Sequence, residues 1–306
     1  MKEQVGNVIL NLDHYKGSDL YSDGDIENTL LGIVKTHPES EYGKVIEEKA
    51  SWPVLYHLSP MRTNLIEWID FKKDTDSVLE VGAGCGALTG IVAQKAKQVT
   101  CIELSKRRSM INAVRHKDLE NIEIYVGNFE DIEPHLLEFD VVMLIGVLEY
   151  AKSYIHSSKP YVEFLKKILE HLKPGGRLIL AIENKLGMKY WAGCPEDHTG
   201  RYFDSIEGYP KGGAACTFSK KELEDLLCQA GYRNIKFYYP YPDYKLPLTI
   251  YSDSYLPLKG SLDPAPNLSG DRLVVFDESK AYDSILDAGL FPEFSNSFLI
   301  FAEKGE

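Results

Sequence analysis

A ten-residue stretch from Cys194 to Phe203, CPEDHTGRYF, gathers several side chains that can do chemistry. It holds a thiol, two carboxylates, an imidazole, a guanidinium and two aromatic rings. Such a set has three interpretations: a metal site, an acid–base centre or a polar loop. A metal would need Cys194, Glu196 and His198 as ligands, but neighbouring residues of one short loop rarely complete a coordination sphere. We therefore predict no metal here, and the other two interpretations depend on the surrounding elements.

A second stretch, VLEVGAGCGALTG at residues 78–90, has glycines where a backbone could approach a ligand. Gly82, Gly84 and Gly86 end a short apolar run and precede a helical pattern. Backbone amides at the start of that helix would face a bound group. With Ala87 at the last position, the pattern also fits the dinucleotide fingerprint, so a nicotinamide cofactor is one alternative.

Two carboxylates favour a different cofactor. Glu80 stands two residues before Gly82, where it would repel the pyrophosphate of NAD and attract the sulfonium and ammonium of S-adenosylmethionine (SAM). Glu103 stands 21 residues after Gly82, at the end of the next apolar run. A carboxylate there can accept hydrogen bonds from both ribose hydroxyls. The charge pattern therefore favours SAM.

The elements that must position these residues alternate between strand and helix. Apolar runs predict strands at 77–82, 98–104, 121–127, 139–146, 177–183, 234–239 and 296–304. Helical patterns occupy 87–96, 105–116, 161–172 and 219–231, and a helix interrupted near Pro60 occupies 52–69. Continuous apolar strands that alternate with helices indicate an α/β fold with a mostly parallel, doubly wound sheet.

Composition narrows the class of protein. The 306 residues are 44% apolar and carry a net charge of −12, which argues against nucleic acid or an anionic membrane surface as the main partner. The five cysteines are scattered without a CxxC pair, so we expect no disulfide framework. No window approaches the roughly 18 apolar residues of a membrane span. We expect a cytoplasmic protein without membrane insertion, and predict no oligomeric state.

Five segments carry a resemblance to a known family: LEVGAGCG, CIELS, VGNFEDI, FDVVMLIGVLEYA and LKPGGRLILAIEN. In this order and spacing, residues 60–240 resemble the class I SAM-dependent methyltransferases. The resemblance implies a Rossmann-like sheet of seven strands in the order 3-2-1-4-5-7-6, with strand seven antiparallel. It also implies SAM as methyl donor and S-adenosylhomocysteine as product.

The resemblance also implies a cofactor site built from several segments. The methionine end of SAM would be held by Glu80, Gly82, Ala83, Gly84 and Gly86. The ribose and adenine would meet Glu103, Leu104, Asn128 and Phe129, with Asn128 standing where the family usually has an aspartate. The sulfonium side would be lined by Ile145 and Gly146. We add two candidates from outside these segments: Tyr21, in an N-terminal lid, and Arg62, which could meet the SAM carboxylate.

The acceptor site is expected on the long loop 183–216, which leaves a strand at the face where open α/β sheets bind ligands. His198 and Arg201 are the leading substrate contacts, with Glu183 and Asn184 beside the transferred methyl group. The alternative is that His198 and Arg201 only brace the loop by pairing with neighbouring acids, and both interpretations stay open.

The whole chain is expected to contain a lid (1–50), the SAM-binding core (51–239), an inserted cap between strands six and seven (240–294) and a last strand (295–306). The segments AIENKLG, EDHTGR, YPDYKLP and FPEFSNSFL resemble bacterial lanthipeptide C-terminal O-methyltransferases and methyltransferases of surface-polysaccharide clusters. The resemblance implies O-methylation. We favour the C-terminal carboxylate of a peptide, because a carboxylate needs no base. Alternatives are a hydroxyl of a sugar, oligosaccharide or other small metabolite and, more remotely, an NAD-dependent oxidoreduction.

Overall fold

A computed structural model describes residues 1–19, 21–268 and 270–305, so Glu306, the end of the predicted last segment, lies outside it. The chain divides into two compact units. The first unit contains Met1–Leu144 and Glu170–Arg177, and the second contains Ile145–Leu169 and Leu178–Glu306. The predicted lid and cap are narrower divisions than these units, and they stay predictions.

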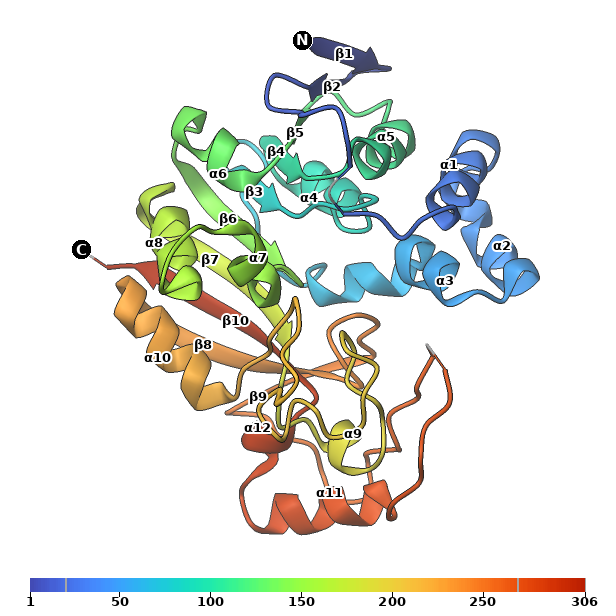
Figure 1. The fold of residues 1–306 in the computed structure, drawn as a ribbon, viewed down its shortest axis with the longest axis vertical. Helices are drawn as coiled ribbons and strands as arrows, with labels where there is room; N and C mark the ends of the chain where they lie inside the picture. Colours follow the sequence, from blue (N-terminus) through green and yellow to red (C-terminus); the bar gives the residue numbers. More distant parts are fainter. Residues whose placement is uncertain (20, 269, 306) are drawn as a thin grey trace. The chain divides into compact units, whose positions relative to one another are not determined.

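The sheet of the first unit has the strand order β1-β2-β5-β4-β3-β6-β7 (Figure 1). Its centre is formed by β3 (Ser77–Val81), β4 (Gln98–Glu103), β5 (Ile122–Val126) and β6 (Phe139–Ile145). Strand β3 pairs in parallel with β4 and β6, and β4 pairs in parallel with β5. Strand β7 (Leu172–Glu183) begins in this unit and ends in the second. The central strands read as apolar runs because their residues are buried on both faces.

Helices link these strands, as the sequence predicts. They are α4 (Thr89–Lys95), α5 (Lys106–Arg115), α6 (Phe129–Ile132) and the 3₁₀ turn η3 (Glu133–His135). Helix α5 begins after Ser105, whose hydroxyl accepts a hydrogen bond from the backbone N–H of Arg108 at 3.2 Å. This N-cap fixes the start of α5 immediately after β4.

The N-terminal fifty residues contain more regular structure than the sequence indicates. Strands β1 (Lys2–Val5) and β2 (Val8–Asn11) form an antiparallel hairpin, and β2 adds in parallel to β5. Four-residue strands carry too little periodicity to be detected from sequence. There follow α1 (Ile26–Thr36), η1 (Glu39–Glu41), α2 (Tyr42–Lys49), α3 (Trp52–Leu58) and η2 (Pro60–Leu65), with the predicted interruption at Pro60.

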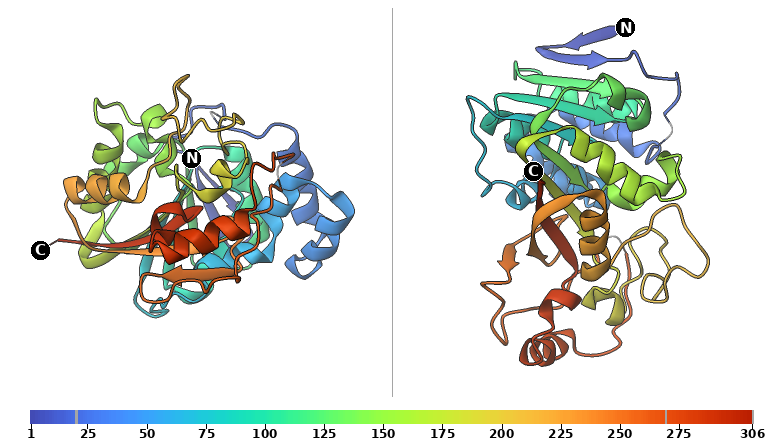
Figure 2. Two further views of the ribbon diagram at one scale, coloured as in Figure 1. Left: turned by 90° about the horizontal axis from the view of Figure 1, so that it is seen from below. Right: turned by 90° about the vertical axis from the view of Figure 1, so that its left-hand side faces the viewer.

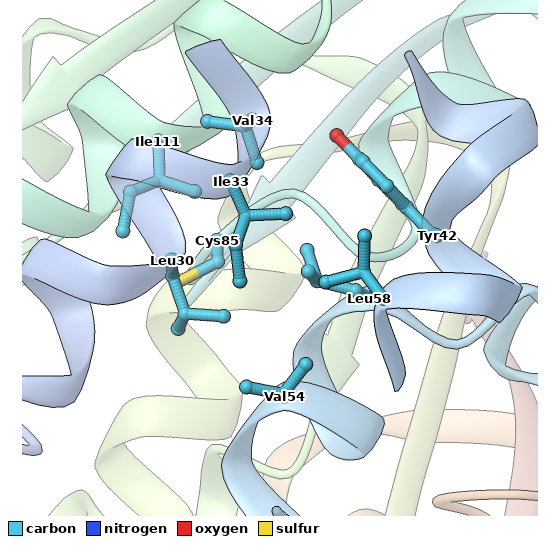
Figure 3. Packing of buried hydrophobic residues seen from close by; sticks show 9 residues of the cluster. Leu30, Ile33, Val34, Tyr42, Val54, Leu58, Cys85 and Ile111 are labelled. Carbon is cyan, nitrogen blue, oxygen red and sulfur yellow. The ribbon is translucent and has the colours of Figure 1, made fainter. Parts of the chain in front are cut away.

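These helices share a core with the glycine loop. The buried cluster consists of Leu30, Ile33, Val34, Tyr42, Val45, Val54, Leu58, Cys85 and Ile111 (Figure 3). Cys85 lies between Gly84 and Gly86, so apolar side chains from α1, α2 and α3 pack directly against the loop. Burial of this cluster therefore holds the loop in place from the side of the N-terminal helices.

The second unit has the strand order β7-β10-β8-β9, with β8 (Tyr232–Tyr241), β9 (Thr249–Ser252) and β10 (Ser297–Lys304). Strand β8 is antiparallel to both β10 and β9. Its helical elements are η4 (Leu148–Tyr150), α7 (Ala151–Tyr154), α8 (Pro160–Glu170), α9 (Met188–Trp191), α10 (Lys220–Ala230), α11 (Glu278–Asp287) and α12 (Phe291–Phe294). Helix α10 has a capping box of Ser219 and Glu222 and lies along β8 (Figure 2).

The predicted fold class is confirmed. Strands β5, β4, β3, β6, β7, β10 and β8 give the expected order 3-2-1-4-5-7-6, and strand seven, β10, is antiparallel to strand six, β8. Strands β1, β2 and β9 are additions at the two ends of this order. Across the described residues, the helices are all too short or too polar to span a bilayer.

Candidate active site

The three glycines of the loop between β3 and α4 have distinct structural roles. Gly82, Gly84 and Gly86 have φ angles of 75°, 55° and 77°, a region that L-residues with side chains rarely adopt. A Cβ added at Gly84 would meet no described atom within 4 Å, whereas one at Gly86 would lie 2.4 Å from Oδ1 of Asn112 on α5. Gly86 therefore permits packing of the loop on α5, and Gly84 leaves open space for a ligand.

Glu103, at the end of β4, is held by backbone amides. Its Oε2 accepts a hydrogen bond from N–H of Gly84 at 2.8 Å, and its Oε1 accepts one from N–H of Ser105 at 2.9 Å. Burial raises the pKa of this carboxyl, and the Arg108 guanidinium opposes that rise. Each carboxylate oxygen has a second lone pair. Glu103 is thus a fixed acceptor that suits the two ribose hydroxyls.

Glu80 and Arg62 are two buried groups of opposite charge. The Oε2 atom of Glu80 accepts a hydrogen bond from the Thr89 hydroxyl at 2.7 Å, and burial raises the pKa of Glu80 to about 7. Arg62 is 6% exposed, its guanidinium lies 4.2 Å from the ring centroid of Tyr56, and its Nε and Nη1 have no hydrogen-bond partner among the described residues. An amino acid moiety such as that of SAM offers a cation for the first group and a carboxylate for the second.

The N-terminal segment lies over the ends of β4 and β5. Asp19 accepts hydrogen bonds from N–H of Lys106 at 2.7 Å and from the Ser105 hydroxyl at 3.0 Å, at the start of α5. The ring of Tyr21 lies 4.4 Å from the Arg108 guanidinium carbon. Sequence reasoning found Tyr21 but not Asp19, although an acid at a helix N-terminus is a usual partner of its free amides.

The three residues expected at the adenine lie together after β4 and β5. Leu104 is half-buried, and Asn128 occupies the N-cap position of α6, next to the buried Phe129. The backbone carbonyl oxygen of His14 would be 2.8 Å from a Cβ at Gly127, so the N-terminal segment passes close to this turn. The adenine contacts themselves stay predictions.

In the second unit, Gly146 follows Ile145 at the end of β6 and is closely covered. Its φ is 69°, and an added Cβ would lie 2.7 Å from the Tyr244 hydroxyl oxygen and 3.6 Å from Oε1 of Glu149. A side chain at this position would therefore collide with Tyr244. The residue expected to line the sulfonium side thus adjoins two polar groups that sequence reasoning did not select.

Glu149 belongs to a cluster of three ionisable side chains. We define this acidic cluster as Glu149, Glu183 and His198. Nε2 of His198 lies 3.8 Å from Oε1 of Glu149 and 4.0 Å from Oε2 of Glu183. Nδ1 of His198 lies 3.0 Å from Oε1 of Glu196. Although burial opposes it, Glu183, Glu149 and Glu196 together raise the pKa of His198 to about 11.

The two glutamates of the cluster have different surroundings. Burial raises the pKa of Glu149. Burial also acts on Glu183, but Lys245 and His198 outweigh it and hold the pKa of Glu183 below its ordinary value. Nζ of Lys245 lies 2.6 Å from Oε1 of Glu183 and 2.6 Å from Oδ1 of Asp197. Asp197 also pairs with Lys189 at 2.8 Å, so neighbouring carboxylates neutralise the charges of both lysines.

The structure separates the predicted substrate residues. His198 and Glu183 belong to the acidic cluster. Arg201 is half-buried; its Nη2 lies 2.6 Å from Oδ2 of the buried Asp204 and donates to the backbone carbonyl of Gly212. Asn184 is fully buried, and its amide donates to the carbonyls of Glu293 and Ser295, both at 2.8 Å. Asn184 thus anchors the loop to the segment before β10.

Sequence reasoning missed one member of the cluster, Glu149, and one neighbour, Lys245, for different reasons. Glu149 follows Gly146 by three residues in the stretch GVLEYA, so its place after a strand end was a usable signal. Lys245 lies 62 residues after its partner Glu183, in the inserted segment, and no local pattern connects the two.

Comparison with known proteins agrees with this geometry. Residues 56–236 match the family described as a methyltransferase domain. A stretch of 132 residues is 27% identical to ribosomal RNA small subunit methyltransferase A of Alkaliphilus metalliredigens, covering 42% of this chain and 44% of that protein. Another of 114 residues is 29% identical to protein-L-isoaspartate O-methyltransferase of Brucella anthropi, covering 37% and 46%. Both matches span less than half of the relative.

A solved structure shares the fold. The crystal structure of a SAM-dependent methyltransferase from Archaeoglobus fulgidus aligns with a TM-score of 0.51 and 13% identity, covering 86% of this chain and 100% of that one. The resemblance to class I methyltransferases and the choice of SAM over NAD are both confirmed. The family match covers more than half of the chain, and the glycine loop with its two strand-end carboxylates agrees with it, so the chain belongs to the methyltransferase domain family.

Proposed function

We propose that this protein transfers the methyl group of SAM to a hydroxyl oxygen of its acceptor. The observation that carries the proposal is a pair of buried carboxylates, Glu149 and Glu183, in the same unit as Gly146. Oε2 of each has no hydrogen-bond partner among the described residues, although the side chains are only 1% and 0% exposed. Buried acceptors of this kind favour a ligand that donates hydrogen bonds.

The same pair disfavours a carboxylate acceptor, the alternative that the sequence favoured. Two unit charges 4 Å apart interact by about 4 kcal/mol at an effective dielectric constant of 20. An acceptor carboxylate beside Glu149 and Glu183 would meet that repulsion from each ionised glutamate. The cations that could offset it are already paired: His198 with Glu196, Lys245 with Glu183 and Asp197, and Arg201 with Asp204.

The proposed step balances its charges and its proton. The acceptor hydroxyl donates its hydrogen bond to Oε2 of Glu149, and its oxygen attacks the methyl carbon. The carbon–oxygen bond forms as the carbon–sulfur bond breaks, which leaves neutral S-adenosylhomocysteine. The hydroxyl proton passes to Glu149, a carboxylate in the role of general base.

The inserted segment supports an acceptor larger than a minimal metabolite. It contributes Tyr244, which covers Gly146, and Lys245, which pairs with Glu183. The inserted segment thus contacts Gly146 and one member of the cluster, Glu183, in keeping with a cap over the acceptor. Within the resemblance stated above, a sugar hydroxyl of a surface polysaccharide or of a smaller metabolite fits better than a peptide C-terminus.

A product assay separates the alternatives. The protein is incubated with SAM and three acceptor sets: sugars and polyols, peptides with a free C-terminus, and primary amines. We expect a mass gain of one methylene in the first set, as a methyl ether that survives mild alkali. A methyl ester that alkali removes, or an N-methyl product, would refute transfer to a hydroxyl.

A pair of variants tests the role of the cluster. Glu149→Gln keeps the shape but removes the base, so kcat should fall about 10²–10⁴-fold while the SAM affinity is retained. Glu163→Gln is the matched control, because its carboxylate is exposed on α8 and pairs only with Lys166 among the contacts described. Equal activity of both variants would show that Glu149 is not the base of the reaction.

A further inference from the structure

We propose that the acidic cluster of Glu149, Glu183 and His198 is a binding site for a divalent first-row metal cation such as Mn²⁺ or Zn²⁺. One ligand atom from each residue can be chosen so that all lie within 4.8 Å of one another. The three residues come from η4, the end of β7 and the loop after α9, so the site is formed by tertiary structure.

The separations suit a metal better than a hydrogen bond. Nε2 of His198 is 3.8 Å from Oε1 of Glu149 and 4.0 Å from Oε2 of Glu183, beyond hydrogen-bonding distance. Two ligands of a tetrahedral ion, each about 2.1 Å from the metal, lie about 3.4 Å apart. A movement of about half an ångström would bring Nε2 of His198 to this separation from each carboxylate oxygen, and the two carboxylate oxygens lie within 4.8 Å of each other.

Unsatisfied oxygen atoms point independently to a missing ligand. Oε2 of Glu149 and Oε2 of Glu183 are both buried without a hydrogen-bond partner among the described residues. Oε2 of Glu183 is also the atom that faces His198, so it is directed into the cluster. A cation held by Oε1 of Glu149 and Oε2 of Glu183 would neutralise both carboxylates, and Oε2 of Glu149 would stay open to a hydrogen-bond donor of the acceptor.

Surrounding residues already orient the three ligands. A histidine that binds a metal through one ring nitrogen usually donates the N–H of the other to a carboxylate. Nδ1 of His198 lies 3.0 Å from Oε1 of Glu196, which suits this arrangement. Glu196 is itself held by N–H of His198 and N–H of Thr199, at 2.9 and 2.7 Å. Lys245 holds Oε1 of Glu183 at 2.6 Å, which leaves Oε2 for the ion.

The donor set indicates the type of metal. Two carboxylates and one imidazole suit Mn²⁺ or Zn²⁺, since Mg²⁺ and Ca²⁺ prefer oxygen ligands alone. On binding, His198 releases one ring proton to the solvent and coordinates as the neutral imidazole. Three protein ligands leave a position for an oxygen atom of a substrate.

The role in catalysis rests on the proposed function, but the site does not. With a hydroxyl acceptor in the open position, its oxygen would bind the ion while the hydroxyl proton passes to the uncoordinated oxygen of Glu149. Carbon–oxygen bond formation and carbon–sulfur cleavage then proceed as proposed above. Metal binding itself needs neither SAM nor an acceptor, so it can be measured alone.

The test uses the full-length protein after dialysis against EDTA. Mn²⁺ is titrated by calorimetry and by the loss of the free-ion EPR signal, and Zn²⁺ by calorimetry. We expect one site per chain, abolished in Glu183→Gln and His198→Asn. Glu196→Gln, which only removes an orienting contact, should weaken binding about 10–100-fold. Glu163→Gln should bind as the wild type does.

Each outcome decides the proposal. Circular dichroism and thermal melting identify a variant that fails to fold, and Glu149→Gln then replaces it. If neither ion binds the wild type, or all variants bind equally, the metal site is refuted. A methyl ether formed by EDTA-treated protein that binds no ion would refute the site and leave the proposed function. A protein that binds the metal but makes only methyl esters would support the metal site and refute the proposed function.

Discussion

Replacement of Arg62 by methionine should stabilise the SAM-free protein and weaken SAM binding. Arg62 is 6% exposed, and two of its guanidinium nitrogens, Nε and Nη1, have no hydrogen-bond partner among the described residues. A buried cation in this state lowers the stability of the folded protein without ligand. If it is kept to bind the SAM carboxylate, stability and affinity must change in opposite directions.

The structure sets the size of both effects. An unsatisfied buried donor costs about 1–3 kcal/mol. Removal of the guanidinium forfeits about 1 kcal/mol of cation–π attraction to Tyr56 at 4.2 Å. With two such donors, we expect the free energy of unfolding to rise by about 1–5 kcal/mol. Loss of charge-assisted hydrogen bonds worth about 1.5–3 kcal/mol should raise the Kd of SAM about 10–100-fold.

Arg115→Met is the matched control, since its side chain is equally buried but fully engaged. Its guanidinium donates to the carbonyls of His57 and Cys85, both at 3.0 Å, and pairs with Glu39 at 3.0 Å. This variant should lose about 2–4 kcal/mol of stability. Urea denaturation without SAM and calorimetry with SAM measure the two quantities. The reasoning is refuted if Arg62→Met loses as much stability as Arg115→Met and keeps its SAM affinity.

Three further predictions concern the loop, pH and the loop anchor. Gly84→Ala should weaken SAM binding and cost about 1–2 kcal/mol of stability because of its positive φ. Gly86→Ala also collides with α5 and should lose more stability than Gly84→Ala. Equal unfolding midpoints of the two variants in urea would contradict this expectation. Burial lowers the pKa of His116 from 6.5 to about 3, so the stability that neutral His116 contributes is complete above pH 6.5 and is lost as the pH falls. Between pH 7.5 and pH 5, the wild type should therefore lose about 2 kcal/mol more free energy of unfolding than His116→Gln does. Urea titration of both proteins at the two pH values measures this difference. Asn184→Ala should cost about 2–3 kcal/mol of stability, because two hydrogen bonds are lost. A lower kcat with an unchanged melting temperature would instead show that Asn184 takes part in the reaction.

Strand order and cofactor could be predicted because their signals are local. The apolar runs of β3 and β4 and the glycines that follow β3 occupy one continuous stretch of sequence. Glu80 and Glu103 stand at the ends of two adjacent parallel strands, and such ends meet at one edge of a sheet. The charge argument for SAM therefore needed only these positions.

The N-terminal region was less predictable. Strands β1 and β2 are four residues each, too short for a periodic pattern, and they are stabilised by pairing with each other and with β5. Asp19 makes its contacts with residues more than 80 positions later, at the start of α5. Only the folded chain connects these segments.

The acceptor site shows the same division. The sequence by itself determined the strand end at Glu183 and the imidazole at His198, because both follow from chain order. Tertiary structure decided that His198 faces Glu149 and that Lys245 neutralises one oxygen of Glu183 while the other stays unpaired. It also decided that Arg201 pairs with the buried Asp204. Sequence determines which charges exist and roughly at which edge of a sheet they lie. Which of them stay unpaired depends on contacts between distant segments and on the exclusion of water, and these exist only in the folded protein.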